Sequence, residues 1–400
     1  MLAVTSSPLA PLPGLGTSPV KFPFPTRLSA PRASFPQGPS GMGTSAARIA
    51  QTWSRAEAEP AHGDLYCPPA VRQDPILERA VNDGLVEWAG QTGIYPARLD
   101  ALHEMNFGRL ITLTYVDTDD YDRLLAVAKM TLAWWSADDY YCDDESLGSV
   151  PALLGSRLAV AYTAVDPVAI PDRYARGLHD AVGDEPVLAA HRSAWRHLSR
   201  YTTPVQAERI RHEAATLFLG YEQEASWRAE DRLPPVWEYL LNRAVNSFRP
   251  NMVMIDAVAG YEVPAHEFAD PRVRRVTNLA GTASVLVNDL YSMAKERSSP
   301  GLDFDLPAVI AAEEGCSPHE AIERSIQVHN DLMTAYEKEA AALALNGSPA
   351  LGRFLAGMWA WLGGNREWHA TTARYRSQDP PVERSSTRNL RPVIDQLGYA

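Results

Sequence analysis

The amino-acid sequence predicts an all-α protein, and three observations support this prediction. From Cys67 onward, long segments repeat apolar residues at helical spacing. Most of these segments begin at Asp, Ser, Thr or Pro and end near Gly or Pro, as capped helices do. No segment shows the convincing alternation of polar and apolar residues that is typical of a half-buried strand. The chain therefore favours a bundle of helices.

Taken in order along the chain, the amphipathic segments predict a succession of helices. They cover residues 75–92, 120–145, 151–163, 185–198, 204–228, 235–248, 271–297, 318–344 and 349–374. The links between them are short and polar, which favours antiparallel neighbours packed around one central apolar cavity. We therefore interpret residues 64–400 as one all-α domain.

The first 63 residues differ in composition from the remainder. They are dense in Pro, Ser, Gly and Ala and carry almost no hydrophobic periodicity, so they cannot bury enough apolar surface to offset the entropy of ordering. We interpret residues 1–63 as a disordered tail. Within it, LGTSPV at 15–20 is echoed by MGTSAARI at 42–49. This echo is either a coincidence of low complexity or a docking motif presented twice, which would gain avidity.

Composition and charge narrow the function classes. The chain is 46% hydrophobic, yet it has no apolar run close to the roughly 20 residues that a membrane helix needs. Its start lacks the features of a secretory signal, so we expect a cytoplasmic protein. A net charge of −12 argues against nucleic-acid and anionic-membrane partners. The three cysteines, Cys67, Cys142 and Cys316, are too scattered for a disulfide framework or a zinc cluster.

An acid-rich segment lies at the end of the helix expected over 120–145. Asp139 and Asp143 are one helical turn apart and Asp138 flanks them, so their carboxylates can converge. Carboxylates at a helix C-terminus oppose the helix dipole and repel one another, which is a cost that a metal site would explain. A solvated acidic helix end is the alternative.

A second set of oxygen donors lies on the helix expected over 271–297. Asn288, Ser292 and Glu296 are spaced i, i+4, i+8, which places an amide, a hydroxyl and a carboxylate on one face. Mg²⁺ prefers such hard oxygen ligands. The preceding sequence LAGTASVLV is almost entirely apolar or small, so this helix is expected to be buried rather than to present a polar outer face.

Cationic residues accompany these two motifs. Arg243 lies 45 residues before Asn288, Lys295 precedes Glu296, and Arg374 forms an RY pair with Tyr375. In an acidic protein, cations beside metal-ligand helices are suited to holding a diphosphate, to which arginine donates bidentate hydrogen bonds. Each of them taken alone is compatible with an ordinary surface residue.

Aromatic residues are candidates for an apolar cavity wall near these motifs. Trp134 and Trp135 lie one turn before Asp138, so at least one of them is expected to point toward the metal end of the bundle. Further candidates are Phe107, Phe248, Trp359 and Trp361. Such rings would line an apolar cavity that excludes water, whereas ordinary core packing is the alternative for each.

Together, these motifs resemble those of the bacterial class I terpene synthases. That family has an aspartate-rich DDxxD-type motif, an NDxxSxxxE motif, a diphosphate-sensing arginine upstream of the latter and a late RY pair, and all four occur here in order. The sequence departs from a strict DDxxD because Cys142 occupies its third acidic position. The resemblance implies ionisation of a prenyl diphosphate that depends on three Mg²⁺ ions.

The segments DDYYCDD, RAVNSFRPNM, NDLYSMAKE and GNREWH, together with the Pro-rich tail, are similar to one group within that family, the 2-methylisoborneol synthases. This likeness implies cyclisation of 2-methylgeranyl diphosphate to 2-methylisoborneol with release of diphosphate. Because members of that group are cargo of encapsulin shells, it also implies that the tail loads the enzyme into a nanocompartment through its two GTS segments. A homodimer is a further expectation.

Several alternatives stay open at this stage. A prenyl-chain elongating synthase would carry a second aspartate-rich motif in place of Asn288, Ser292 and Glu296, so it is disfavoured. A cyclase acting on geranyl or farnesyl diphosphate, or one forming 2-methylenebornane, differs only in cavity volume and in quenching of the cation. A non-catalytic helical protein associated with a shell would explain the tail but not the combined metal and diphosphate motifs.

Overall fold

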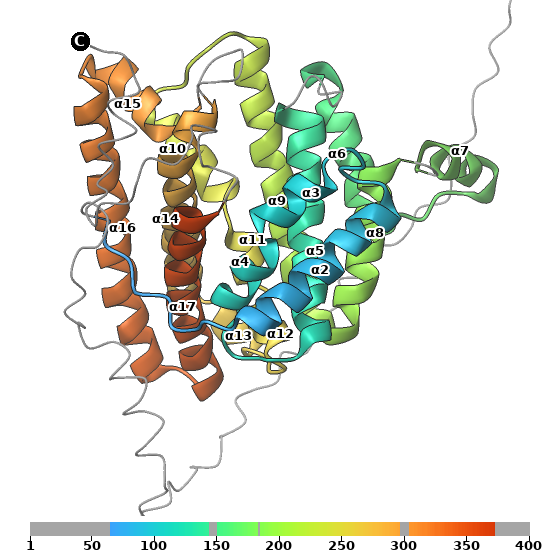
Figure 1. The fold of residues 1–400 in the computed structure, drawn as a ribbon, viewed down its shortest axis with the longest axis horizontal. Coiled ribbons are helices and arrows are strands. Elements are labelled where there is room, and N and C mark those ends of the chain that lie inside the picture. The colour runs from blue at the N-terminus through green and yellow to red at the C-terminus, as the bar shows by residue number, and fades with distance from the viewer. Residues whose placement is uncertain (1–64, 144–149, 183–184, 297–303, 373–400) are drawn as a thin grey trace, which may run out of the picture. The chain divides into compact units, whose positions relative to one another are not determined.

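The computed structural model describes residues 65–143, 150–182, 185–296 and 304–372, and Figure 1 shows how their helices are arranged. Every regular element in these ranges is helical, and no strand occurs among the described residues. The predicted all-α fold is therefore confirmed. None of the described helices is long and apolar enough to cross a membrane.

The long helices follow the order expected from the sequence. They are α2 (Pro75–Thr92), α5 (Tyr121–Ala137), α6 (Leu154–Tyr162), α8 (Pro186–Leu198), α9 (Pro204–Ala229), α10 (Val236–Val245), α14 (Pro271–Glu296), α16 (Pro318–Asn346) and α17 (Pro349–Thr371). The structure also contains the helices α3 (Leu99–Met105), α4 (Phe107–Thr114), α7 (Asp172–Val182), α11 (Arg249–Met252), α12 (Ile255–Val258), α13 (Ala265–Phe268) and α15 (Leu306–Glu314), with 3₁₀ turns at Pro151–Leu153 and Ser199–Tyr201.

Side-chain caps explain where the long helices begin. The carboxylate of Asp74 accepts a hydrogen bond from the backbone N–H of Leu77 at the start of α2. Thr203 forms a reciprocal capping box with Gln206 at the start of α9, and Ser317 begins α16 in the same way. Each cap satisfies N–H groups that a helix terminus otherwise leaves unpaired. The cap residues seen in the sequence therefore mark real helix starts.

Two kinds of difference separate the structure from the sequence prediction. The helices α3, α4, α7, α11, α12, α13 and α15 were not expected; all of them except α7 have fewer than ten residues, which gives little periodicity to recognise. Asn106, at φ 52°, ends α3 and caps α4. The helix expected over 120–145 is also not one continuous α-helix: α5 ends at Ala137 and a π-helical turn, Asp138–Asp143, follows.

Helix α14 lies inside the bundle, where it packs against α10, α16 and α17, and α17 packs in turn against α4 (Figure 1). The approach of α17 to α4 depends on Gly364. A Cβ atom at this position would lie 2.3 Å from the carbonyl oxygen of Leu113, which is closer than any side chain tolerates. Glycine therefore lets α17 and α4 pack backbone against backbone.

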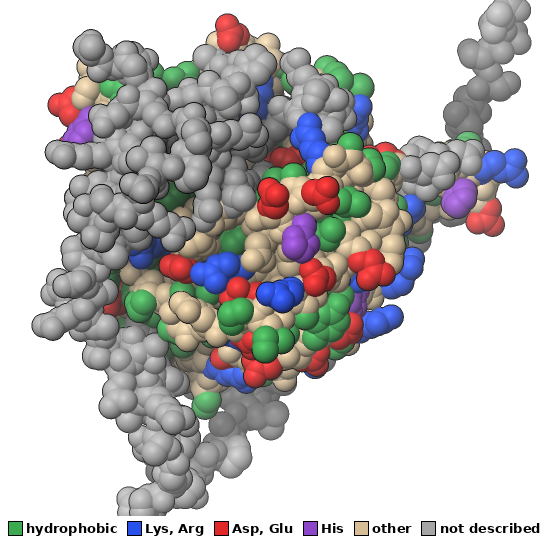
Figure 2. Space-filling model, in the orientation of Figure 1, with side chains coloured by type: hydrophobic (Ala, Val, Ile, Leu, Met, Phe, Trp, Pro, Cys, Tyr) green, Lys and Arg blue, Asp and Glu red, His purple; other side chains and the backbone are tan. Residues whose placement is uncertain are grey.

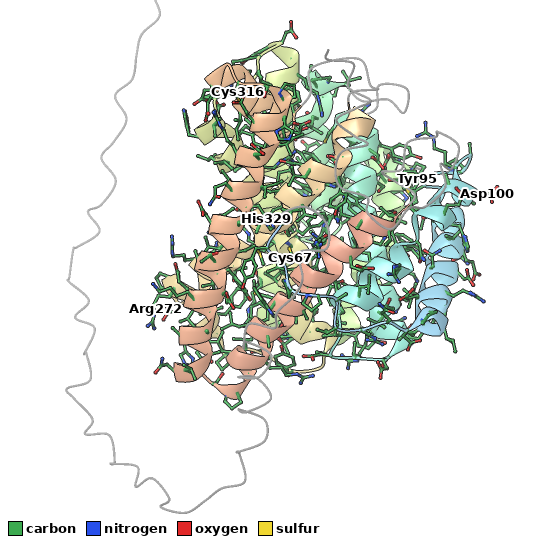
Figure 3. The ribbon with its side chains drawn as sticks, turned by 60° about the vertical axis from the view of Figure 1, so that its left-hand side comes forward. Cys67, Tyr95, Asp100, Arg272, Cys316 and His329 are labelled. Carbon is green, nitrogen blue, oxygen red and sulfur yellow. The ribbon has the colours of Figure 1, made fainter. Side chains whose placement is uncertain are left out.

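Residues 65–72 form an extended segment, the N-terminal strap, which lies across α16 and α17. The backbone N–H of Tyr66 donates to Oδ1 of Asn330 at 2.8 Å, and Sγ of Cys67 lies 3.7 Å from Nε2 of His329. Figure 3 shows Cys67 and His329 beside each other next to α16. At Gly363 of α17, a Cβ atom would lie 2.7 Å from the carbonyl oxygen of Pro68. The strap is thus fixed to the C-terminal part of the bundle.

On the face formed by α2, α3 and α4, acidic and basic side chains are interspersed (Figure 2). Some of these charges pair across helices, as in the contacts of Arg109 with Glu78 of α2 and Glu367 of α17, at 3.3 and 3.1 Å. The carboxylate of Glu78 is buried, so its pair with Arg109 is largely shielded from solvent and joins α4 to α2.

Candidate active site

The acid-rich segment continues α5 as a wider turn. The backbone N–H of Asp138 bonds the carbonyls of both Trp134 and Trp135, and Sγ of Cys142 lies 3.8 Å from the carbonyl oxygen of Ala137, five residues earlier. The backbone of Asp138–Asp143 forms a π-helical turn, a rare element that occurs mostly as a single turn and frequently at functional sites. Asp138 is half-buried here.

The two adjacent aspartates of this turn have different surroundings. Oδ2 of Asp139 accepts a hydrogen bond of 2.7 Å from the hydroxyl of Tyr95, which lies in the loop after α2. The backbone N–H of Tyr95 donates in turn to the hydroxyl of Tyr140. Asp139 therefore ties the acidic turn to a neighbouring loop. The side chain of Asp143 lies outside the described residues.

On α14, the residues of the second motif face different partners. Nδ2 of Asn288 lies 3.2 Å from Nε2 of His369 on α17, whereas Ser292 is buried at 3% exposure. Asp289, on another face, is 1% exposed, and burial raises the pKa of its carboxyl in spite of the nearby Arg243. The side chains of Lys295 and Glu296 lie outside the described residues, as do Arg374 and Tyr375.

Arg243 of α10 is held between two carboxylates. Its Nη2 atom lies 3.1 Å from Oδ1 of Asp289, and its Nη1 atom lies 3.6 Å from Oε2 of Glu224 on α9. Its Nε–H donates to the hydroxyl of Tyr239 at 2.8 Å, and Nη2 donates to the carbonyl oxygen of Phe304. These contacts orient the guanidinium beside α14.

Glu224 continues these contacts toward the acidic turn. Its Oε1 atom accepts from Arg228 at 2.7 Å, and Arg228 donates to the carbonyl oxygen of Cys142 at 2.9 Å. A chain of polar contacts therefore runs from the π-helical turn through α9 to Arg243 and α14. Sequence reasoning missed Glu224 and Arg228, although their spacing of four residues on one helix was a usable signal.

Four of the six aromatic residues expected in the cavity wall form one cluster. The ring of Trp135 lies 4.5 Å from that of Phe107 and 5.9 Å from that of Phe248, and Phe248 lies 5.4 Å from Trp361. Trp368, which was not predicted, stacks on Trp135 at 5.7 Å. We call these five rings the aromatic cluster.

The other two expected wall residues lie elsewhere. Trp359 stacks on Tyr336 of α16, with ring centroids 6.0 Å apart, and contacts Tyr66 of the N-terminal strap. Trp134 is buried, and its carbonyl oxygen accepts from the hydroxyl of Tyr221 on α9. Neighbouring positions on one helix point in different directions, so Trp135 joins the aromatic cluster and Trp134 does not.

The donor chemistry of the described residues fits a hard divalent cation. Asp138, Asn288 and Ser292 offer a carboxylate, an amide and a hydroxyl oxygen, all of which suit Mg²⁺. Across the described part of the chain, no three His, Cys, Asp or Glu side chains gather into a cluster. The acidic turn and α14 would each contribute a few of these oxygen donors.

Comparison with known sequences agrees with this geometry. The family described as terpene synthase family 2, C-terminal metal binding, matches residues 129–335, which include the acidic turn, Arg243 and α14. The chain therefore belongs to the terpene synthase family, whose members are enzymes.

Two relatives show which terpene synthases this chain resembles. The chain is 41% identical over 320 residues to the 2-methylisoborneol synthase of Saccharopolyspora erythraea, a match that covers 78% of this chain and 89% of the relative. It is 39% identical over 358 residues to the 2-methylisoborneol synthase of Streptomyces ambofaciens, with 86% and 81% covered.

A solved structure is similar along almost its whole length. The crystal structure of 2-methylisoborneol synthase from Streptomyces coelicolor A3(2), in complex with Mg²⁺ and 2-fluoroneryl diphosphate, matches with a TM-score of 0.76 and 36% identity. The match covers 80% of this chain and 99% of that chain. The fold is that of a class I terpene synthase.

Proposed function

We propose that this chain is a Mg²⁺-dependent cyclase that converts 2-methylgeranyl diphosphate to 2-methylisoborneol and releases diphosphate. The observation that carries the proposal is the position of His369, whose ring contacts Asn288 of the metal motif and lies 6.0 Å from Phe248 of the aromatic cluster. A diphosphate held at α14 would thus place its hydrocarbon chain against aromatic rings. The relatives to which this chain is 41% and 39% identical are both named 2-methylisoborneol synthases, which supports this activity.

Asp138, Asn288 and Ser292, together with Asp143 and Glu296, would hold the metal, three ions being expected with bound diphosphate. Bound magnesium would supply positive charge that neutralises the departing diphosphate. The solved relative in complex with Mg²⁺ and a diphosphate analogue supports this assignment. Asp139, whose Oδ2 atom accepts from Tyr95, would add a further carboxylate oxygen to this set.

Arg243 would bind the diphosphate from the side of α10. Its guanidinium is already oriented by Tyr239, Asp289 and Glu224, so little reorganisation is needed when charge develops on the phosphate oxygens. Lys295, Arg374 and Tyr375 would add donors around the same group. No protein nucleophile is required, since departure of the diphosphate itself generates the carbocation.

The aromatic cluster would exclude water and stabilise the cation. The faces of Trp135, Phe248 and Trp361 carry negative quadrupole charge, which attracts a positive carbon in an apolar site. Capture by water would end the reaction as an alcohol. Deprotonation would instead give 2-methylenebornane.

The deciding experiment incubates the purified enzyme with MgCl₂ and, in separate reactions, geranyl, 2-methylgeranyl and farnesyl diphosphate. Volatile products are identified by gas chromatography and mass spectrometry. We expect 2-methylisoborneol from 2-methylgeranyl diphosphate and loss of turnover when EDTA removes the metal. A clear preference for farnesyl diphosphate would show that this compound, rather than 2-methylgeranyl diphosphate, is the substrate. Turnover of none of the three would refute the cyclase proposal.

The proposal extends to the N-terminal segment, residues 1–63, which lies outside the described residues. Its two GTS segments support a loading function for an encapsulin shell. Removal of residues 1–60 is expected to spare turnover and abolish co-assembly with a shell protein. Light scattering on the same samples tests the expected homodimer. Normal co-assembly of the shortened chain would refute the loading function.

A further inference from the structure

His369 lies in the last turn of α17 and is buried at 2% exposure. Its two ring nitrogens face different groups. Nδ1 lies 2.8 Å from the backbone carbonyl oxygen of Asn365, one turn earlier, and Nε2 lies 3.2 Å from Nδ2 of Asn288 on α14. The ring thus bridges its own helix and the helix of the metal motif.

The partner of Nδ1 determines what Nε2 can do. A carbonyl oxygen only accepts hydrogen bonds, so Nδ1 must carry the hydrogen in this contact. In the neutral ring, Nε2 then has a lone pair and acts as an acceptor. The NH₂ group of Asn288 therefore donates to His369, and this fixes the orientation of the amide, with its oxygen on the other side.

Contacts around the ring keep it in place. Trp368 meets the ring edge-on at 4.9 Å, and Phe248 and Tyr291 lie 6.0 and 6.1 Å away. A second contact aligns the two helices four residues earlier, where Nδ2 of Asn365 donates to the carbonyl oxygen of Ser284 at 3.1 Å. Asn365 and His369 therefore match the spacing of Ser284 and Asn288, so α17 is held in register with α14.

We propose that His369 is a positioning residue, which accepts a hydrogen bond from Nδ2 of Asn288 and so presents Oδ1 of that amide to Mg²⁺. This inference rests on the proposed function. Orientation matters because the two ends of an amide differ: the oxygen is a hard ligand suited to Mg²⁺, whereas the NH₂ group has no available lone pair. An amide free to rotate would spend part of its time with the wrong end toward the metal.

The test measures metal binding directly, without turnover. Mg²⁺ is titrated by calorimetry into the full chain in the presence of inorganic diphosphate. The variant His369→Phe keeps an aromatic ring but offers no acceptor, and it is expected to bind Mg²⁺ 10- to 100-fold more weakly, the usual cost of losing a partner of a metal ligand. His369→Gln, whose carbonyl can accept, is expected to recover most of this loss.

Kinetics provide the second readout. In His369→Phe, the Mg²⁺ concentration for half-maximal rate is expected to rise strongly, whereas kcat at saturating Mg²⁺ changes much less. The matched control is His329→Phe on α16. His329 is also fully buried, but its ring faces Cys67 and Asn330 rather than α14, so this variant is expected to keep the Mg²⁺ requirement of the wild type.

A double variant separates orientation from packing. A carboxylate has two equivalent oxygens and needs no orientation, so in an Asn288→Asp background the change His369→Phe is expected to cause no further loss of Mg²⁺ binding. An equal loss in both backgrounds would overturn the inference, and so would wild-type Mg²⁺ binding by His369→Phe. If the wild type itself bound neither Mg²⁺ nor diphosphate, the proposed function would fail together with the inference.

Discussion

Arg243 and Asp289 form a buried ion pair that joins α10 to α14, with Nη2 of the arginine 3.1 Å from Oδ1 of the aspartate. Tyr239 strengthens this connection, because its hydroxyl contacts both Nε of Arg243 and Oδ2 of Asp289, each at 2.8 Å. Asp289 lies inside the NDxxSxxxE motif but directs its carboxylate at an arginine. Asp289 therefore contributes to the site by holding the guanidinium of Arg243 in place.

The first prediction concerns this ion pair. Asp289→Ala removes the nearer of the two carboxylates that hold the buried Arg243 and leaves only Glu224, 3.6 Å away, so the free energy of unfolding is expected to fall by up to about 3–5 kcal/mol. Urea unfolding measures the change. Glu208→Ala is the matched control, because the exposed Glu208 pairs with Arg211 on the outer surface of α9, and little change is expected there. Equal effects of the two substitutions would contradict the structural importance of the pair.

The second prediction concerns acid stability. Burial lowers the pKa of His191 from 6.5 to about 4, because a charged ring is disfavoured inside the bundle. The unfolded chain therefore binds a proton between these values and the folded chain does not. Stability from this group is complete above pH 6.5 and is lost as the pH falls toward 4, by about 1.4 kcal/mol per pH unit.

Urea unfolding of wild type and His191→Phe at pH 7, 6 and 5 tests this dependence. The variant is expected to show the shallower decline, since it has lost the titrating group. His103→Phe is the control, because the side chain of His103 is half exposed beside Asp83. If His191→Phe declined as steeply as the wild type, other groups would have to account for the acid sensitivity.

The third prediction concerns the aromatic cluster. Trp135→Leu removes the ring that contacts Phe107, Phe248 and Trp368. If this ring stabilises the cation by the about 0.5–2 kcal/mol typical of such contacts, kcat/KM falls about 2- to 30-fold and by-products increase. Trp359→Leu, outside the cluster, is expected to alter stability without changing the product profile. If Trp359→Leu changed the product profile and Trp135→Leu did not, the assignment of Trp135 to the cavity wall would be refuted.

The fourth prediction concerns the packing of α17. Gly364→Ala places a methyl group against the carbonyl oxygen of Leu113 and is expected to destabilise the fold by about 1–3 kcal/mol. Gly352→Ala on the same helix meets its nearest atom at 3.8 Å, so the usual gain of up to about 1 kcal/mol is expected. Thermal unfolding distinguishes the two, and a stabilising Gly364→Ala would show that the helices are less closely packed.

Much of this architecture could be predicted from the sequence, because periodicity and caps are local signals. The start of α2 and the buried α14 were both predicted in this way. Phe107, Trp135, Phe248 and Trp361 were predicted as wall residues and lie together, but Trp359 was indistinguishable from them, since one aromatic residue on a buried helix resembles another. Its separate position depends on α16, which no local pattern encodes.

The conformation and contacts of the acidic turn could not be predicted from the local sequence, for a different reason. A π-helical turn and an α-helical turn share nearly the same residue preferences, so Asp138–Asp143 could not be distinguished from a continuation of α5. The partner of Asp139 is Tyr95, 44 positions earlier, and this pairing depends on tertiary packing. His369 is part of the segment GNREWH, but its contact with Asn288 depends on how α17 packs against α14, which no local pattern encodes.

The attachment of the N-terminal strap has a consequence for synthesis of the chain. Cys67 meets His329 262 positions later, so the part of the strap around Cys67 lacks its contact with α16 until that helix has been translated. At typical rates this takes on the order of 10–50 s. Burial raises the pKa of Cys67 to about 12 in the finished fold, and until then its thiol is open to oxidants and to other nascent chains. The completed bundle therefore protects a cysteine that the ribosome-bound chain leaves reactive.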